Sequence, residues 1–115
     1  MRLSVIIPVF NESDSILEVV EAVFSCGVPD VEVVVVDDGS TDHTPERLQA
    51  VLGRGGLTIL RHERNLGKGA AIRTARNHVS GDAVVIQDAD LEYDPSELPR
   101  LFRLIENDRA DVVYG

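Results

Sequence analysis

Five short apolar runs, rich in β-branched residues, constrain the fold of this chain more than any other feature. They occupy residues 3–7, 31–36, 57–61, 82–86 and 111–114. Each run is hydrophobic throughout, whereas a strand with one face in water alternates apolar and polar residues. Uniform runs of this kind are typical of strands that are buried on both faces. We therefore predict a parallel sheet that is covered on both sides.

Segments with a helical period separate these runs. Apolar residues recur at helical spacing over residues 16–24, 48–52, 72–79 and 98–105, and each segment places one apolar stripe against the sheet. Thr44 followed by Pro45 suits an N-cap and a first helical position, while Gly53 and Gly81 suit helix ends. Repeated strand–helix–strand units with right-handed crossovers predict an α/β fold of a Rossmann-like kind, with a mostly parallel sheet and helices on both faces.

Length and composition narrow the classes of protein to which the chain can belong. Its 115 residues, 43% hydrophobic and 27% charged, are expected to form a single globular domain over residues 1–115. The net charge of -9 argues against non-specific binding to nucleic acid, whose phosphates would be repelled. The single cysteine, Cys26, forms no internal disulfide, which is compatible with a reduced cytoplasm, and we predict a buried structural thiol.

We expect neither a secretion signal at the start of the sequence nor a membrane span within it. The opening apolar run is interrupted too early by Pro8, Asn11 and Glu12 to be a secretion signal, so we interpret it as a strand. No run approaches the roughly 18 apolar residues of a membrane span. The last predicted strand stops at the chain terminus, where a functional loop would normally follow. We therefore expect a fragment of a longer protein.

Polar clusters fall at the carboxyl ends of three predicted strands. The segment PVFNE (8–12) follows the first strand, DDGSTD (37–42) the second and QDADLE (87–92) the fourth. In open parallel sheets, ligands bind outside the carboxyl ends of the strands, where the winding direction reverses. With the usual strand order 3-2-1-4, the first and fourth strands are neighbours, and the three loops surround a single crevice.

The acidic residues after the fourth strand point to a metal site. Asp88 and Asp90 are two residues apart, so in extended geometry both carboxylates lie on one side, and Glu92 continues the spacing. Like charges this close repel one another unless a cation lies between them. Mg²⁺ typically takes one or two carboxylates while substrate phosphates supply further ligands. A solvated surface turn is the alternative.

Two further motifs have both a structural and a ligand-binding interpretation. Asp37 and Asp38 either form a turn or place a carboxylate on a base or ribose, with Gly39 allowing close approach. The segment NLGKGAA (65–71) opens a helix whose amino end and Lys68 favour phosphate, and the alternative is flexible glycines beside a solvated lysine. It matches neither a P-loop nor a dinucleotide fingerprint.

The three histidines show no spacing typical of a metal site or a catalytic triad. They stand at positions 43, 62 and 78. We predict that each is an exposed or capping residue.

In their order and intervals, four segments resemble the amino-terminal half of family 2 glycosyltransferases, which have the GT-A fold. They are SVIIPVFNE, VVVVDDGSTD, NLGKGAA and QDADLEYDP, and together they span essentially the whole chain. NLGKGAAI and DADLEYDP look most like the branch that includes dolichol-phosphate mannosyltransferase and bacterial enzymes that load polyprenyl phosphates with sugars.

The resemblance implies a role for each matching residue. Pro8, Phe10 and Glu12 would line the nucleotide site, although the family often has Tyr where this chain has Phe10. Asp38 would contact the base or ribose, with Asp37 more structural.

The same resemblance assigns the metal ligands and the catalytic carboxylates. Asp88 would lie nearer the ribose and Asp90 nearer the diphosphate, and both would bind the metal. Glu92 would be a third ligand, at a position where this branch can have Gln.

The resemblance also implies the reaction. A divalent ion, Mg²⁺ or Mn²⁺, would act as a Lewis acid on the diphosphate that leaves a UDP- or GDP-sugar. The sugar would move with inversion to a lipid phosphate, dolichyl or undecaprenyl, or to a glycan, and any general base would lie beyond residue 115. We expect a cytoplasmic location, with peripheral membrane association through the missing part.

Two alternatives remain open at this point. One is a nucleotide-sugar-binding fragment without turnover. The other is a phosphoacceptor receiver domain, a signalling module of similar length that also uses clustered carboxylates and Mg²⁺. A receiver has its acidic pair after the first strand and a lysine after the fifth. Here the first strand ends in Pro8 to Glu12 and the fifth ends the chain, which disfavours a receiver.

Overall fold

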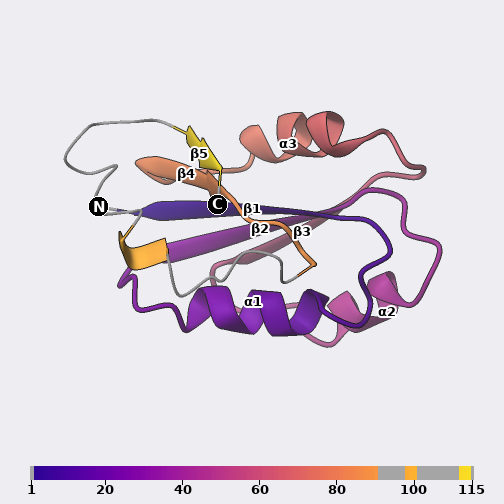
Figure 1. Ribbon diagram of the computed structural model, residues 1–115, viewed down its shortest axis with the longest axis horizontal. Coiled ribbons are helices and arrows are strands. Elements are labelled where there is room, and N and C mark those ends of the chain that lie inside the picture. Colours follow the sequence, from indigo (N-terminus) through magenta and orange to yellow (C-terminus); the bar gives the residue numbers. More distant parts are fainter. Residues whose placement is uncertain (1, 91–97, 101–111, 115) are drawn as a thin grey trace.

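The computed structural model of the protein describes residues 2–90, 98–100 and 112–114. In this part of the chain, strands and helices alternate as the sequence predicts (Figure 1). The strands are β1 (Leu3–Val9), β2 (Val31–Asp37), β3 (Leu57–Arg61), β4 (Ala83–Ile86) and β5 (Val112–Tyr114). The helices are α1 (Ile16–Phe24), α2 (Thr44–Gln49) and α3 (Lys68–Arg76). Residues 98–100 are also helical, and the rest of the helix predicted there lies outside the described residues.

The strands form one parallel sheet in the order β3-β2-β1-β4-β5. The predicted order 3-2-1-4 is therefore confirmed. Ile6 of the central strand β1 lies opposite Val34 of β2 and Ile86 of β4. The chain winds outward from β1 to β3 and then returns to the other side of β1, so the switch point lies between β1 and β4.

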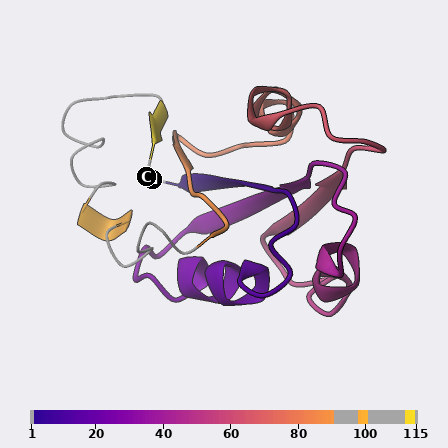
Figure 2. The same ribbon diagram turned by 45° about the vertical axis from the view of Figure 1, so that its right-hand side comes forward.

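Helices cover both faces of the sheet, as predicted. α1 and α2 lie on one face and α3 lies on the other (Figures 1 and 2). Successive side chains of β2 serve the two cores in turn: Val33 and Val35 pack on the α1 side, and Val34 and Val36 on the α3 side. All four are fully buried. Burial of each such side chain contributes about 1.5–3 kcal/mol to folding, which explains the uniformly apolar sequence of the strand.

Several boundaries differ from the prediction for identifiable reasons. α2 includes Thr44, with His43 at the N-cap, because the side chain of Asp42 accepts a hydrogen bond from the Thr44 N–H at 2.9 Å. β3 is only partly buried because it is the edge strand next to β2. The prediction that Cys26 is buried is wrong, since this thiol is half-buried at the margin of the α1-side core.

Gly81 does not end a helix, because α3 ends at Arg76. Instead, Gly81 packs against the start of β1, where its N–H donates to Ser4 Oγ at 2.8 Å. The Ser4 hydroxyl in turn donates to the carboxylate of Glu32, which also accepts hydrogen bonds from Ser80. Burial alone would raise the pKa of Glu32, but these hydrogen bonds and the charge of Arg2 lower it overall. This polar cluster lies at the amino ends of the strands, at the opposite edge of the sheet from their carboxyl ends.

No helix among the described residues combines the length and the apolar character that crossing a lipid bilayer requires.

We predict that Gly81→Ala destabilises the protein by about 1–3 kcal/mol, the usual cost of overpacking. A Cβ at this position would stand 2.7 Å from the Ser4 backbone nitrogen and 3.0 Å from the Ala83 carbonyl oxygen, neither of which can move without disturbing the sheet. Urea unfolding measures the change. Gly55→Ala is the control, because its added Cβ meets nothing within 4 Å, and equal losses in the two variants would contradict the prediction.

Candidate functional site

A pocket of about 330 Å³ opens at the carboxyl ends of β1, β2 and β4. Its walls come from three strand ends and from the segment that enters α3. The lining residues are Pro8, Val9, Phe10, Asp38, Asn65, Gly67, Lys68 and Asp88. The three loops that the sequence predicts to share one crevice therefore meet here, and the segment NLGKGAA joins them.

Backbone hydrogen bonds fix where these loops leave the sheet. The Asp38 N–H donates to the Val9 carbonyl at 2.8 Å, and the Gln87 N–H donates to the Ile6 carbonyl at 2.9 Å. Each bond continues a parallel ladder one step past the strand. The first residues of the loops are thus part of the hydrogen bonding of the sheet.

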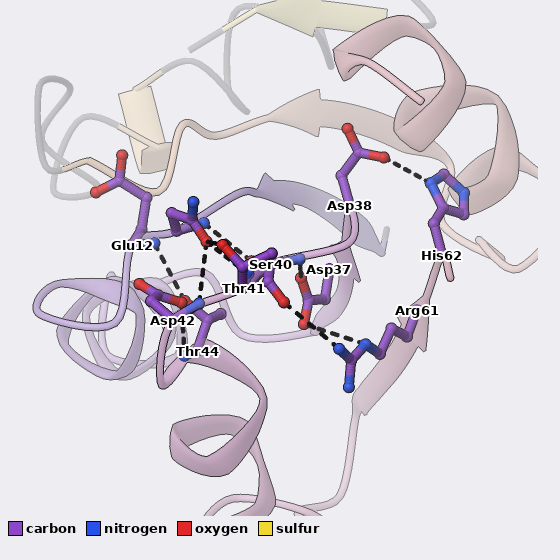
Figure 3. A network of polar contacts seen from close by, with 10 residues as sticks. Glu12, Asp37, Asp38, Ser40, Thr41, Asp42, Thr44, Arg61 and His62 are labelled. Carbon is purple, nitrogen blue, oxygen red and sulfur yellow. Dashed lines mark hydrogen bonds and ion pairs between the residues drawn. The ribbon is translucent and has the colours of Figure 1, made fainter. Parts of the chain in front are cut away.

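The two acidic residues after the apolar part of β2 point to opposite sides of the sheet (Figure 3). Val35 faces α1 and Val36 faces α3. Because side chains alternate along a strand, Asp37 falls on the α1 side and Asp38 on the α3 side. The adjacent carboxylates therefore have different partners and only Asp38 reaches the pocket.

Asp37 has the contacts of a turn residue. Its Oδ1 accepts the Ser40 N–H at 2.9 Å, and its Oδ2 lies 3.9 Å from Arg61 Nε without a hydrogen bond. The side chain is almost fully buried. Arg61 therefore offsets the buried charge while Asp37 shapes the loop after β2.

The Asp38 carboxylate binds the segment that leads to α3. Its Oδ1 accepts hydrogen bonds from His62 Nδ1 at 2.8 Å and from the Leu66 N–H at 2.8 Å, and its Oδ2 accepts the Gly67 N–H at 2.9 Å. Burial alone would raise the pKa of Asp38, but these hydrogen bonds and the nearby His62 lower it overall. A carboxylate has about four acceptor positions. One position on Oδ2 therefore remains for a ligand that donates a hydrogen bond.

Gly39 allows this segment to lie directly on the loop after β2. Its φ of +75° is in the left-handed region, and a Cβ there would stand 2.5 Å from the Asn65 backbone nitrogen. The sequence suggests that Gly39 admits a ligand closely. In the structure, the group that approaches it is the chain's own backbone.

Across the pocket, Lys68 Nζ lies 2.7 Å from Asp88 Oδ1. Asp88 shares the strand alternation of Ile86, which faces α3, so its side chain is on the same side of the sheet as Asp38. Lys68 is the first residue of α3. The side chains are 51% and 25% exposed, and a pair this exposed contributes about 0–1 kcal/mol to stability. The contact can therefore be exchanged for another at little cost.

A second polar network joins the loops after β1 and β2 (Figure 3). The Asn11 side chain accepts the Thr41 N–H at 2.8 Å, and Thr44 Oγ1 accepts the Glu12 N–H at 3.1 Å. Asp42 accepts hydrogen bonds from Thr44 and Ser13, which outweigh burial and lower the pKa of Asp42 to about 2. This network holds the wall that carries Pro8 and Phe10.

Glu12 lies beside the pocket rather than on its lining. Its carboxylate is 3.4 Å from Ser15 Oγ, and the Ser15 hydroxyl is 2.5 Å from the Ala89 carbonyl oxygen. The start of α1 is thus joined to the loop after β4.

The prediction that His62 is an exposed or capping residue is wrong. Its side chain is 10% exposed and contacts Asp38 and Thr74 at once. Pairing of Asp37 with Arg61 in the sheet sets His62 beside Asp38. The sequence carries one sign of this role, because His62 is a polar residue directly after the third strand, as Asp38 is after the second. His43 and His78 are exposed, as predicted.

A sequence model of the family described as glycosyl transferase family 2 matches residues 4–115. The chain belongs to glycosyl transferase family 2. A relative in Edwardsiella ictaluri, named undecaprenyl-phosphate 4-deoxy-4-formamido-L-arabinose transferase, is 40% identical over 104 residues, which cover 86% of this chain and 32% of that protein. The predicted family and its polyprenyl-phosphate branch are thus confirmed.

Solved structures of similar proteins agree with the fold. A mannosyltransferase from Pyrobaculum calidifontis, in complex with GDP-Man and Mn²⁺, has a TM-score of 0.81 and 34% identity over 90% of this chain and 32% of that one. TarS from S. aureus, in complex with UDP-GlcNAc, has a TM-score of 0.80 and 29% identity over 96% of this chain and 33% of that one. The GT-A fold is thus confirmed. This family 2 chain spans about a third of the length of the proteins that it matches.

The metal that family 2 implies fits the chemistry of the side chains at the pocket. Asp88 already faces a cation there, the ammonium group of Lys68. Asp90 is exposed in a turn after β4, so the extended geometry of the prediction does not continue to it. Glu92 lies outside the described residues. Among residues 2–90 and 98–100, no three His, Cys, Asp or Glu side chains gather as a metal cluster. The two aspartates suit an ion that takes its other ligands from phosphate and water.

We predict that Asp38→Asn lowers the free energy of unfolding at pH 7 by about 1–3 kcal/mol, because His62, Leu66 and Gly67 lose the charged acceptor of their hydrogen bonds. The pKa of Asp38 is lowered on folding, so its stabilisation is present above the unfolded value, 3.8, and is lost as pH falls through the lower folded value. The free energies of unfolding of the two proteins, measured with urea, should therefore converge as the pH is lowered from about 6 to about 3. A pH-independent difference would contradict this account.

Proposed function

We propose that this chain is the donor-binding part of a metal-dependent glycosyltransferase that takes a sugar from a nucleoside-diphosphate sugar. The observation that supports this most is the meeting of Asp38, Asp88 and Lys68 on one pocket at the switch point of the sheet. The pocket thus combines three groups in a space of suitable size. Asp38 is a hydrogen-bond acceptor for the nucleoside, Asp88 is a carboxylate for a cation, and Lys68 is an ammonium group for phosphate. The solved relatives in complex with GDP-Man and UDP-GlcNAc support the same substrate class.

The nucleoside is assigned to the Asp38 side of the pocket. An ionised carboxylate only accepts hydrogen bonds, so its partner must be a base N–H or a ribose hydroxyl and not a phosphate oxygen. Pro8, Val9 and Phe10 supply an apolar wall beside it. Phe10 is 43% exposed, and cover by a flat base would bury part of its ring.

The diphosphate is assigned to the Lys68 side. Lys68 lies at the amino end of α3, where the helix dipole and the unpaired N–H groups favour an anion. Asp88 and Asp90 would hold the metal, with Glu92 as a third ligand. When bound, the ion supplies Lewis-acid stabilisation of the charge on the departing diphosphate. Lys68 turns from Asp88 to the phosphates and adds a second positive charge there.

The acceptor in this proposal is a polyprenyl phosphate, and the sugar moves with inversion. The Edwardsiella ictaluri relative, whose name includes undecaprenyl phosphate, supports this choice. A phosphate acceptor is already anionic, so none of the described residues has to remove a proton from it. A lipid acceptor also implies work at a membrane surface, and we propose its cytoplasmic face.

Binding rather than turnover tests the proposal, because the chain spans about a third of its relatives. We predict that UDP or GDP binds at least about tenfold more tightly with Mn²⁺ than with chelator, measured by calorimetry. Asp88→Asn should remove this metal dependence. Asp30→Asn, at an exposed position near the amino ends of the strands, is the control and should keep it. Absence of nucleotide binding, or binding that ignores the metal, would reject the proposal.

We predict that Lys68→Met weakens binding of the diphosphate by about tenfold but leaves binding of the free nucleoside within about twofold. The ammonium group faces phosphate in the proposed arrangement, whereas the nucleoside lies by Asp38. Fluorescence or calorimetric titration with UDP against uridine, and GDP against guanosine, separates the two. Arg76→Met, at the far end of α3 and exposed, is the matched control for loss of charge. Equal weakening of nucleoside and diphosphate would contradict the assignment.

A further inference from the structure

His62 is the one described side chain that joins the pocket to the body of α3 through both of its ring nitrogens. Nδ1 lies 2.8 Å from Asp38 Oδ1 and Nε2 lies 2.8 Å from Thr74 Oγ1. Figure 3 shows the ring turned toward the Asp38 carboxylate. The two side chains are 10% and 5% exposed, so water competes little for the contact.

The partners fix which way the ring faces. Asp38 is ionised at neutral pH because its pKa is lowered, and an ionised carboxylate accepts only. Nδ1 therefore carries a hydrogen and donates it to Asp38. Nε2 pairs with the Thr74 hydroxyl, which can either donate or accept a hydrogen bond. A flip of the ring would break both hydrogen bonds, so the orientation is specified from both sides.

The orientation matters because the other donors to Asp38 come from a surface segment. Leu66 and Gly67 bind through backbone N–H groups on an exposed loop, whereas His62 is held by a residue within α3. His62 is thus the side-chain donor that sets the rotation of the carboxylate, in addition to the backbone N–H of Gly67 at the N-cap of α3. The acceptor position left on Oδ2 takes its direction from that rotation.

We infer that His62 is a positioning residue of the donor site, whose Nδ1 hydrogen bond aims the Asp38 carboxylate at the nucleoside, while Thr74 of α3 adds a second hydrogen bond that supports the ring. The inference rests on the proposed function. It concerns binding of the base or ribose, and His62 itself does not touch the ligand, since it is not among the residues that line the pocket.

Two substitutions of His62 separate its two hydrogen bonds. Asn places an amide N–H near the position of Nδ1, and Gln places its amide near the position of Nε2. His62→Asn therefore keeps the bond to Asp38 and loses the bond to Thr74, while His62→Gln does the reverse. Each variant loses one hydrogen bond at the same half-buried position, so a purely structural role predicts similar stability and similar affinity for both.

Calorimetric titration with UDP and GDP in the presence of Mn²⁺ tests the inference on the full chain. We expect His62→Gln to lower the affinity for UDP or GDP about tenfold. The affinity of His62→Asn should stay within about threefold of that of the unaltered protein. Thermal unfolding measures the stability of both. His78→Gln is the control, because His78 is exposed and contacts the Thr74 backbone instead of its side chain.

The outcomes distinguish this inference from the proposed function. Equal affinities in the two His62 variants, or losses that simply follow stability, would overturn the positioning role while leaving the proposed function intact. Failure of the unaltered chain to bind either nucleotide would overturn both.

Nuclear magnetic resonance of the unaltered chain gives a readout that does not depend on how the variants fold. The Nδ1 proton of His62 should be visible and should shift when UDP or GDP is added with Mg²⁺. An unchanged signal at saturating nucleotide would overturn the inference.

Discussion

The buried negative charge of Asp38 is the group on which the geometry of the pocket depends. A charge removed from water is tolerated only where hydrogen bonds replace the lost hydration. Here those bonds come from residues 62–67, which must therefore stay folded over the end of β2. Because Gly67 is one of the donors, the next residue, Lys68, begins α3 at a fixed place beside Asp88. One carboxylate thus sets the position of the cation on the opposite wall.

The alternation of side chains along the strands decides which acids meet. Val36 and Ile86 face α3, and the acids two residues beyond them, Asp38 and Asp88, lie on that same side. The small residues of α3, Ala71 and Ala75, are fully buried against the sheet. Their size lets the helix approach closely, so that its amino end stands next to the strand ends. The pocket is therefore a product of the same packing that forms the second core.

The sequence predicts the sheet order and the edge that carries the pocket, because uniformly apolar runs and polar strand ends report directly on burial. It does not predict strand register, and the pairing of Asp37 with Arg61 is what sets His62 beside Asp38. The spacing of Asp88 and Asp90 likewise carries no information about the turn at residues 89 and 90, which interrupts the extended geometry. These details depend on contacts between distant segments, which local patterns do not encode.

The pairing of Lys68 with Asp88 has a consequence for how a charged ligand enters. A pocket lined by converging acids would repel a diphosphate, yet this one holds its own counterion at 2.7 Å. A ligand that arrives with a divalent ion then exchanges partners with an existing ion pair instead of neutralising bare charge. The net affinity for such a ligand is therefore a difference between two ionic contacts, and Lys68 keeps the carboxylate of Asp88 partnered on the wall of the pocket.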